Sequence, residues 1–557
     1  MELFNLNHVS FSFPNTDQHV LKDISLSINE GEFLVIGGAS GSGKTTLLKV
    51  LKRELTPAGQ LEGEVLYKGK LINEWGERQM VEQVGYVFQD PDNQIVMDEV
   101  MQEIVFGLEN LGYSTFEMRK RVAEMVHFFG VEDLLNAKPS ELSGGQKQLL
   151  NLLSVLLMKP RVLLLDEPTS QLDPVAAKEL VLMLERLNKE TGMTIVLVEH
   201  RLEELFAVAD RVVLVESGQI RYEGDSRQVI GELYMDQATQ FFPYVPTFAR
   251  LYMEFEEKPV IAKIPLTVKE CKQWIGREEH EIAPVEAQSN QSKEPWILEM
   301  DDVFFRYEKK APFVLKSFTL RIPKGQFFAM VGGNGSGKTT ALRTSLGSIK
   351  PQRGKVRLNG QDMRKMKDSE WIGKIAYLPQ NPRTYFVQQT IEEEMQNIGE
   401  RLKLSNLTER MHHLLEAFGI SHLRTRHPYD CSGGEVQKAA LACILLGEPD
   451  MLFIDEPTKG MDPISKQHLG ELLYSLQQDG LTIFMVTHDI GFAASYAERC
   501  AMMFDGEIAA DGTPDEVFKG NYFYTTAINR ATRETKQPEV LTYEEAVRTW
   551  VVRESIY

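Results

Sequence analysis

Two glycine-rich segments of this sequence have the residue types and spacing of a phosphate-binding loop. The pattern Gly-x-x-Gly-x-Gly-Lys-Thr occupies residues 38–45 and recurs at residues 332–339. Glycines let backbone N–H groups turn toward phosphate oxygens, and the N-terminus of a following helix favours the same negative charge. The lysine of each loop would neutralise charge on nucleotide phosphates, and the threonine hydroxyl would reach Mg²⁺. The predicted phosphate contacts are Gly38, Ser40, Gly41, Gly43, Lys44, Thr45 and Thr46 in the first loop, and Gly332, Asn334, Gly335, Gly337, Lys338, Thr339 and Thr340 in the second.

An acidic pair follows each loop further along the chain. Asp166 and Glu167 end one apolar run, and Asp455 and Glu456 end another. The aspartate of each pair suits a contact to Mg²⁺ or to water bound to Mg²⁺. The glutamate beside it is placed to polarise an attacking water molecule. The acidic pairs therefore predict hydrolysis at both phosphate sites.

The motifs of the first half return in the same order in the second half. His200 and His488, for example, each close an apolar run at nearly the same distance beyond their loops. A nearly constant separation between equivalent motifs indicates one domain that has been duplicated. The predicted organisation is a first domain at residues 1–235, a linker at 236–295, a second domain at 296–520 and a C-terminal tail at 521–557.

The elements that must position these residues can be predicted from short apolar runs and helical patterns. Strands that alternate with helices indicate α/β domains with a mainly parallel sheet. Strands are predicted at Phe33–Ile36, Val162–Leu165, Thr194–Val198, Phe327–Val331, Met451–Ile454 and Thr482–Val486, and helices at Thr45–Leu51, Thr339–Leu346 and Tyr543–Val552. Within the linker, Glu281–Pro295 is polar and is predicted to be a flexible tether, whereas its earlier part is apolar enough to pack.

Composition excludes several classes of protein. The chain has 557 residues, of which 43% are apolar and 25% charged, and its net charge is −19. The acidic balance counts against a nucleic-acid partner. The four cysteines are not spaced for a zinc or iron–sulfur site, and scattered thiols suit a reducing compartment. We find no secretory signal and no uninterrupted apolar span of about 20 residues, so the chain is expected to be soluble by itself.

Two further motifs connect these residues to a known family. The runs Leu-Ser-Gly-Gly-Gln at Leu142–Gln146 and Cys-Ser-Gly-Gly-Glu at Cys431–Glu435, with the two Asp-Glu-Pro-Thr runs, resemble the ATP-binding-cassette (ABC) ATPases. The resemblance covers nearly the whole chain except the linker and the tail. It implies two tandem P-loop NTPase domains, each with a RecA-like core of mainly parallel sheet, a β subdomain and a helical signature subdomain. It also implies ATP and Mg²⁺ as the ligands.

The resemblance assigns roles to further residues. Phe13 and Tyr307 would stack on adenine, and the aspartates Asp173 and Asp462 would signal between the two cassettes. The signature residues would cap the ATP held by the opposite cassette: Ser143, Gly144, Gly145, Ser432, Gly433 and Gly434. The catalytic residues would be Glu167, Glu456, His200, His488, Gln89 and Gln380. The Mg²⁺ ligands would be Thr45, Gln89, Asp166, Thr339, Gln380 and Asp455.

The second signature departs from the family pattern at both ends. Cys431 replaces the leading leucine and Glu435 replaces the glutamine. The serine and both glycines, which would hold the phosphate, are kept. Both sites are therefore expected to hydrolyse ATP.

Other segments are similar to one group within the family, the energy-coupling-factor transporters, which import vitamins and metal ions. These segments are Gln89–Gln94, Phe106–Asn110, Val198–Leu202 and Pro265–Glu270. In that group a membrane coupling protein inserts arginine-bearing helices beside such segments. The carboxylates of Asp90, Asp92 and Glu99 would suit those arginines, although a solvated acidic loop would look the same. The second copy has Arg383 where the first has Asp92, so the two docking grooves are predicted to be unequal.

The resulting hypothesis is an ATP-hydrolysing motor subunit on the cytoplasmic face of the cell membrane. Its partners would be a transmembrane coupling protein and a separate substrate-binding membrane protein, and its two cassettes would pair within one chain. The substrate would be a vitamin, a vitamin precursor, a thiamine-related compound or a metal ion. One alternative is the double-cassette ATPase of a sugar or amino-acid importer. A more distant alternative is a ribosome-associated twin-cassette ATPase, which the acidic linker disfavours.

Overall fold

The computed structural model describes residues 1–551 except 15, 17, 277–280, 283–294, 367–372 and 536. Contacts within the chain divide it into two compact units, Met1–Thr267 and Val268–Tyr557. Most of the predicted tether, at residues 283–294, lies outside the described residues. The division between the units falls inside the predicted linker.

The centre of the first unit is a six-stranded sheet in the order β10-β9-β3-β8-β7-β6. Neighbours from β9 to β6 run parallel, and β10 is antiparallel to β9. All five residues of β3, β7 and β8 are buried, as expected for parallel strands covered on both faces. The strands are β3 (Phe33–Gly37), β6 (Val84–Val87), β7 (Val162–Asp166), β8 (Thr194–Val198), β9 (Arg211–Glu216) and β10 (Gln219–Gly224).

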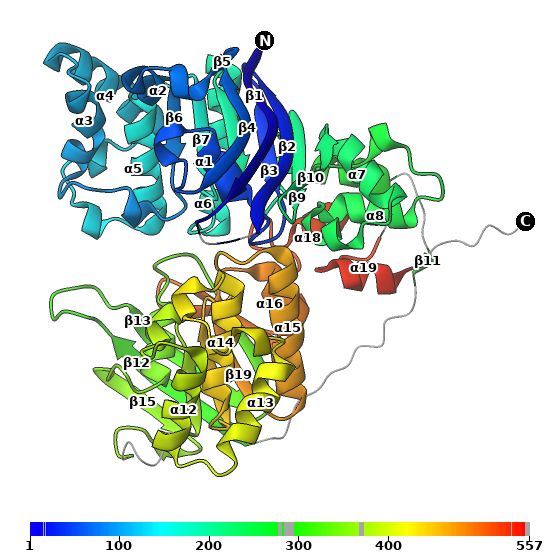
Figure 1. Cartoon of the computed structure of the whole chain (residues 1–557). Helices are drawn as coiled ribbons and strands as arrows, with labels where there is room; N and C mark the ends of the chain where they lie inside the picture. Colours follow the sequence, from blue (N-terminus) through cyan, green and yellow to red (C-terminus); the bar gives the residue numbers. More distant parts are fainter. Residues whose placement is uncertain are drawn as a thin grey trace, which may run out of the picture. The chain divides into compact units, whose positions relative to one another are not determined.

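A second, antiparallel sheet in the order β2-β1-β4-β5 shares its core with the parallel sheet. Its strands are β1 (Glu2–Ser12), β2 (His19–Asn29), β4 (Gln60–Tyr67) and β5 (Lys70–Leu71). Figure 1 shows helices α3, α4 and α5 beside one another at the other end of this unit. The helices of this part of the chain are α1 (Lys44–Val50), α2 (Glu77–Gln83), α3 (Val100–Asn110), α4 (Thr115–Phe129), α5 (Gly144–Leu156) and α6 (Pro174–Thr191).

The apolar first part of the predicted linker packs on the first unit. It holds α8 (Thr247–Phe255) and follows α7 (Ser226–Met235). Phe241 is buried and its ring lies 5.6 Å from that of Tyr222 on β10, edge to face. The expectation that this stretch packs is therefore confirmed.

The second unit repeats this architecture. Its mainly parallel sheet has the order β17-β18-β19-β14-β20-β21 and its antiparallel sheet has the order β13-β12-β15-β16. Its strands are β12 (Trp296–Phe305), β13 (Leu315–Pro323), β14 (Phe327–Val331), β15 (Arg353–Leu358), β16 (Gln361–Asp362), β17 (Ile375–Leu378), β18 (Met451–Asp455), β19 (Thr482–Thr487), β20 (Arg499–Phe504) and β21 (Glu507–Gly512). Every strand predicted from the sequence is present.

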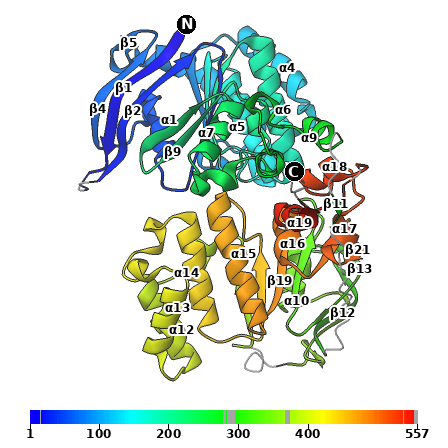
Figure 2. The same ribbon diagram turned by 90° about the vertical axis from the view of Figure 1, so that its right-hand side faces the viewer.

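In the second unit, helices α12, α13 and α14 likewise lie at one end, and the antiparallel strands lie at the other end (Figure 2). They are α10 (Lys338–Ser345), α12 (Ile391–Leu402), α13 (Leu407–Ala417), α14 (Gly433–Leu445), α15 (Pro463–Gln478), α16 (Ile490–Tyr496) and α17 (Pro514–Phe518).

The tail folds onto the end of the linker. Helix α9 (Val268–Ile275) packs on α18 (Ala527–Thr532), and the tail continues in α19 (Tyr543–Thr549). The short strands β11 (Glu281–Ile282) and β22 (Trp550–Val551) pair antiparallel. The helix predicted at Tyr543–Val552 thus ends at Thr549, and Val552 lies outside the described residues.

Among the described residues, no helix is both long enough and apolar enough to span a bilayer.

Candidate active site

The first phosphate loop joins β3 to α1 through left-handed backbone. Gly41 and Gly43 have φ values of 77° and 101°, a region that glycine enters without a Cβ penalty. At Gly38 a Cβ would lie 2.2 Å from the carbonyl oxygen of Val215, so only glycine fits against that strand. Lys44 reaches back across the loop, and its Nζ donates to the carbonyls of Gly38 at 2.8 Å and Ala39 at 2.7 Å.

The second loop has the same geometry. Gly335 and Gly337 have φ values of 77° and 106°. Lys338 donates to the carbonyls of Gly332 at 2.9 Å and Gly333 at 3.1 Å. The lysine of each loop therefore stabilises a loop conformation that suits a bound anion. Its ammonium group lies beside the place where phosphate oxygens would bind.

A threonine of each loop bonds to the aspartate at the end of a strand two positions away in the same sheet. Thr45 Oγ1 donates to Asp166 Oδ1 at 2.9 Å, and Thr339 Oγ1 donates to Asp455 Oδ1 at 3.1 Å. Both carboxylates are buried. Burial raises the pKa of Asp166, and it raises the pKa of Asp455 to about 6. These oxygens lie together as the sequence predicted, in a place where a cation would offset the cost of the buried charge.

The glutamate beside each aspartate has unusual backbone geometry. Glu167 and Glu456 have φ values of 45° and 50°, which is costly for a residue with a side chain. Glu167 Oε1 lies 2.6 Å from His200 Nε2, and Gln89 Nε2 donates to Glu167 Oε2 at 2.7 Å. The first unit thus brings three predicted catalytic residues into contact.

The corresponding contacts in the second unit differ. His488 Nδ1 lies 2.7 Å from Glu456 Oε2, and the His488 backbone N–H donates to the same oxygen at 3.1 Å. Lys338 Nζ lies 3.7 Å from Glu456 Oε1. Burial disfavours the charged carboxylate, but the hydrogen bond and charge of His488, helped by Lys338, outweigh it and lower the pKa of Glu456. In the described part of the chain, Gln380 forms no hydrogen bond to Glu456.

The signature residues lie at the N-termini of helices, where Ser143 is exposed and Ser432 is half-buried. Ser143 is the N-cap of α5 and forms a capping box with Gln146. Ser432 is the N-cap of α14, and Glu435 closes the same box. Glu435 thus does locally what glutamine does in the first copy. Cys431 is buried like Leu142, so the two departures keep the local structure.

The aspartates predicted to signal between cassettes and the aromatic residues predicted to stack on adenine lie in different surroundings. Asp173 and Asp462 are N-caps, of α6 and α15 respectively. The rings of Phe13 and Tyr307 are 40% and 61% exposed, which leaves surface on which a base could stack. The Tyr307 hydroxyl also lies 3.1 Å from Thr340 Oγ1 of the phosphate loop.

Three contacts of the first site were missed by sequence reasoning. Tyr86 donates to Asp166 Oδ2 at 3.1 Å. Lys147, on the signature helix, lies 2.5 Å from Asp92. Glu199 is buried and binds Thr169. A signal for Glu199 was available, since a carboxylate at the end of an apolar strand is rarely buried without a partner.

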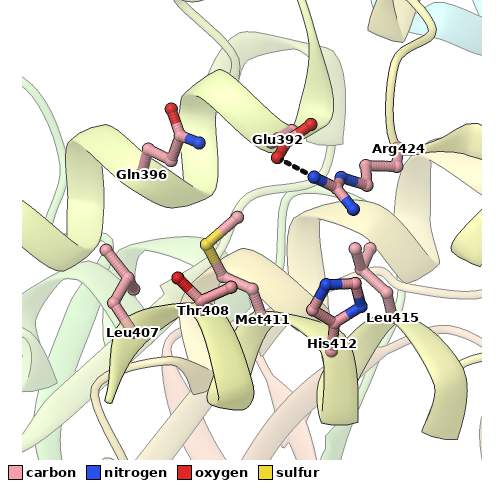
Figure 3. Close-up of a pocket in the computed structure, with 8 residues that line it drawn as sticks. All are labelled: Glu392, Gln396, Leu407, Thr408, Met411, His412, Leu415 and Arg424. Atoms are coloured by element: carbon pink, nitrogen blue, oxygen red, sulfur yellow. Dashed lines mark hydrogen bonds and ion pairs between the residues drawn. The ribbon is translucent and has the colours of Figure 1, made fainter. Parts of the chain in front are cut away.

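A pocket in the second unit lies apart from this chemistry. It is formed by α12, α13 and Arg424, which pairs with Glu392 at the mouth (Figure 3). None of the predicted site residues lines it.

Comparisons with known proteins agree with this arrangement. The family model described as ABC transporter matches residues 21–170 and 315–459. The chain belongs to the ABC transporter ATPase family. The ABC ATPase therefore carries two cassettes and is an ATP hydrolase coupled to transport.

Relatives match the chain along almost its full length. A Bacillus thuringiensis ABC transporter ATP-binding protein is 44% identical over 97% of each chain. A Methanosarcina acetivorans ABC transporter ATP-binding protein is 32% identical over 92% of this chain and 86% of its own. Among solved structures, cbiO1 from Clostridium perfringens, described as part of the ABC transporter complex cbiONQ, is 32% identical over 43% of this chain and 95% of its own, with a TM-score of 0.39.

Proposed function

We propose that both cassettes bind ATP with Mg²⁺ and hydrolyse it, and that the chain is the motor of a membrane importer of the energy-coupling-factor type. The observation that carries the first part is the cluster of Gln89, Glu167 and His200 beside a phosphate loop. Glu167 contacts both Gln89 and His200, although the three residues come from separate segments of the sequence.

The chemistry of the oxygen donors fits Mg²⁺. The hydroxyl of Thr45 and the carboxylate of Asp166 are hard oxygen ligands already in contact, and Mg²⁺ takes such ligands together with phosphate oxygens and water. Gln89 would be the third protein ligand of the ion in the first cassette. Thr339, Asp455 and Gln380 would hold the ion in the second. When bound, Mg²⁺ would neutralise charge that develops on the β- and γ-phosphates.

The protein's own groups would bind ATP and orient water. The loop N–H groups and Lys44 would hold the phosphates, and an adenine would stack on Phe13. Glu167 would accept a hydrogen bond from the attacking water, while His200, which contacts both Glu167 and the Gly38 carbonyl, would face the γ-phosphate. Equivalent roles fall to Lys338, Tyr307, Glu456 and His488.

The signature serines would complete each site from the opposite cassette. The N-terminus of α5 at Ser143 and that of α14 at Ser432 both present free N–H groups and positive dipole ends, which suit a γ-phosphate. ATP would thus join the two cassettes, within one chain in our proposal, and hydrolysis would separate them. The N-cap aspartates Asp173 and Asp462 would link the two sites.

The importer type rests on the segments around the first glutamine. Asp90 caps its own short turn through Asp92 N at 3.1 Å, Asp92 is 67% exposed in its side chain, and Glu99 is exposed at the N-cap of α3. Exposed carboxylates beside a solvent-facing loop would pair with arginines of a membrane coupling protein. The chain would then lie peripherally on the cytoplasmic membrane face. A separate membrane protein would bind a vitamin, a vitamin precursor such as a thiamine-related compound, or a metal ion.

This proposal is tested by co-purification with the membrane proteins of the source cell in mild detergent. Charge reversal in D92K/E99K is expected to abolish recovery of small multi-span membrane proteins while ATP binding survives. K147Q breaks the Asp92–Lys147 ion pair but keeps the docking carboxylates, so it should assemble normally. E74K/E77K reverses two exposed carboxylates outside the docking segments and changes the net charge by the same amount, so it controls for net charge.

Each result decides between alternatives. Full recovery of membrane partners by D92K/E99K contradicts the docking surface. Recovery of an external solute-binding protein with the parent chain would indicate a sugar or amino-acid importer. Recovery of ribosomes without membrane proteins would overturn the transport proposal.

A further inference from the structure

Glu199 connects the two segments that flank Glu167. It directly follows β8, one residue before His200, and its side chain is buried. Its Oε1 accepts from the Thr169 backbone N–H at 2.8 Å and from Thr169 Oγ1 at 2.5 Å. Its Oε2 accepts from the His200 backbone N–H at 3.1 Å. The Glu199 carboxylate therefore binds Thr169, which lies two positions after Glu167. It also binds the backbone of His200, whose side chain contacts Glu167.

The second cassette lacks this carboxylate. Thr487 occupies the equivalent place, and its hydroxyl accepts from the Asp489 N–H at 3.0 Å. Thr458, the equivalent of Thr169, is buried, and its hydroxyl has no hydrogen-bond partner among the described residues. The His488 N–H donates instead to Glu456 Oε2.

This difference between the cassettes changes which hydrogen bonds the proposed catalytic glutamate of each one makes. In the first cassette, Glu199 accepts the His200 backbone N–H, and Glu167 Oε2 accepts from Gln89. In the second, Glu456 Oε2 accepts both the backbone N–H and the Nδ1 of His488. Since a carboxylate has a fixed number of lone pairs, the bonds that Glu456 makes to His488 compete with bonds to a glutamine or to water.

We propose that Glu199 is a positioning residue, which frees Glu167 from the His200 backbone and orients it toward Gln89 and the attacking water. The two ATP sites are consequently unequal, with the first pre-organised for hydrolysis and the second dependent on rearrangement of Glu456. This inference rests on the proposed role of Glu167.

Hydrogen bonds hold the Glu199 side chain at a place where burial disfavours its charged form. Burial and the nearby Glu167 carboxylate raise the pKa of Glu199, while the two hydrogen bonds from Thr169 oppose that rise. A buried carboxylate with three donors is therefore a rigid anchor, and its loss would leave the N–H of Thr169 without an acceptor.

The main test is E199T, which gives the first cassette the residue of the second. ATP turnover of the full chain is measured in the parent and in an E456Q background, with E167Q as the reference for a disabled first site. We expect kcat to fall about tenfold in the background that isolates the first site, since small misplacement of a catalytic group has effects of this order or larger. The KM for ATP should stay within twofold. E456Q alone abolishes ATP turnover if the two sites must hydrolyse ATP in strict alternation. In that case the whole fall in kcat caused by E199T should appear in the parent background.

A matched pair separates positioning from general stability. T169V removes the hydroxyl that Glu199 binds and should lower kcat, whereas T458V removes a hydroxyl without a partner and should not. E199Q keeps the Thr169 contact but turns an N–H group toward the His200 backbone, so it should give an intermediate loss. It also serves if E199T fails to fold.

The outcomes are distinguishable. Values of kcat for E199T and T169V within twofold of their matched parents in both backgrounds would overturn the inference. So would a rise in KM at constant kcat, which would indicate a role in ATP binding alone. Parent-like turnover of E167Q would instead remove the proposed role of Glu167 itself, whatever E199T does.

Discussion

The imidazole of His200 touches the carboxylate of Glu167 through Nε2, at 2.6 Å, while its Nδ1 lies 3.2 Å from the carbonyl oxygen of Gly38. The histidine thus joins the glutamate to the phosphate loop. In the second cassette His488 meets Glu456 through Nδ1 instead, and its Nε2 has no partner among the described residues. The two repeats share a fold and a motif set but not one hydrogen-bond pattern.

The second signature should depend on Glu435 as a cap and not on its charge. E435Q keeps the capping box with Ser432 and should melt within about 1 °C of the parent. E435A removes it, which costs about 1 kcal/mol and should lower the melting temperature of the second cassette by about 2–4 °C. Differential scanning calorimetry without nucleotide measures both. A lower melting temperature for E435Q than for E435A would contradict the capping role.

The buried charge of Asp455 should destabilise the chain in the absence of nucleotide. Burial raises its pKa from 3.8 to about 6, so the folded state binds a proton more tightly than the unfolded state. The resulting loss of stability begins as pH rises above about 4 and is complete above about 6. D455N keeps the oxygen that accepts from Thr339 and removes the charge. Its melting temperature should exceed that of the parent at pH 7.5 and exceed it by less at pH 5.

The sign of that difference should reverse with saturating ATP and Mg²⁺ at pH 7.5, because the variant loses a ligand of the ion. A melting temperature for D455N below that of the parent at pH 7.5 without nucleotide would contradict the assignment of Asp455 as a strained, buried charge.

The four thiols should report unfolding. Cys271, Cys431, Cys443 and Cys500 are all buried. Burial raises the pKa of each, and that of Cys271 to about 12. Since the thiolate is the reactive form, the folded chain should react with a disulfide reagent at pH 8 far more slowly than free cysteine. Four thiols should react promptly in denaturant. Prompt reaction of Cys271 in the folded chain would show that α9 leaves α18 readily.

Much of the fold could be predicted because its signals are local. Four consecutive apolar residues before a glycine loop specify β3, and five specify β14. The contact of Thr45 with Asp166 follows from the motif, since the parallel strands β3 and β7 end at the same edge of one sheet. The proposed roles of these residues remain predictions from the resemblance.

Contacts that depend on side-chain direction could not be predicted. Lys147 and Asp92 are far apart in sequence, and nothing near either residue indicates the other as its partner. The contacts of His200 and His488 likewise differ together with the residue that precedes each histidine, which is Glu199 in the first cassette and Thr487 in the second. The packing of α9 on α18 was not predicted either, because each helix is short and is stabilised by the other.

The most direct test of the account is ATP turnover by the purified chain with its two glutamates replaced separately and together. E167Q and E456Q remove the negative charge proposed to polarise water, but each keeps the volume of the side chain and one oxygen that accepts a hydrogen bond. We expect each single variant to lose at least about half of the parent turnover, and the double variant to bind ATP but to hydrolyse it at least 100-fold more slowly. Parent-like turnover in the double variant would contradict the assignment of these residues, and with it the proposed site.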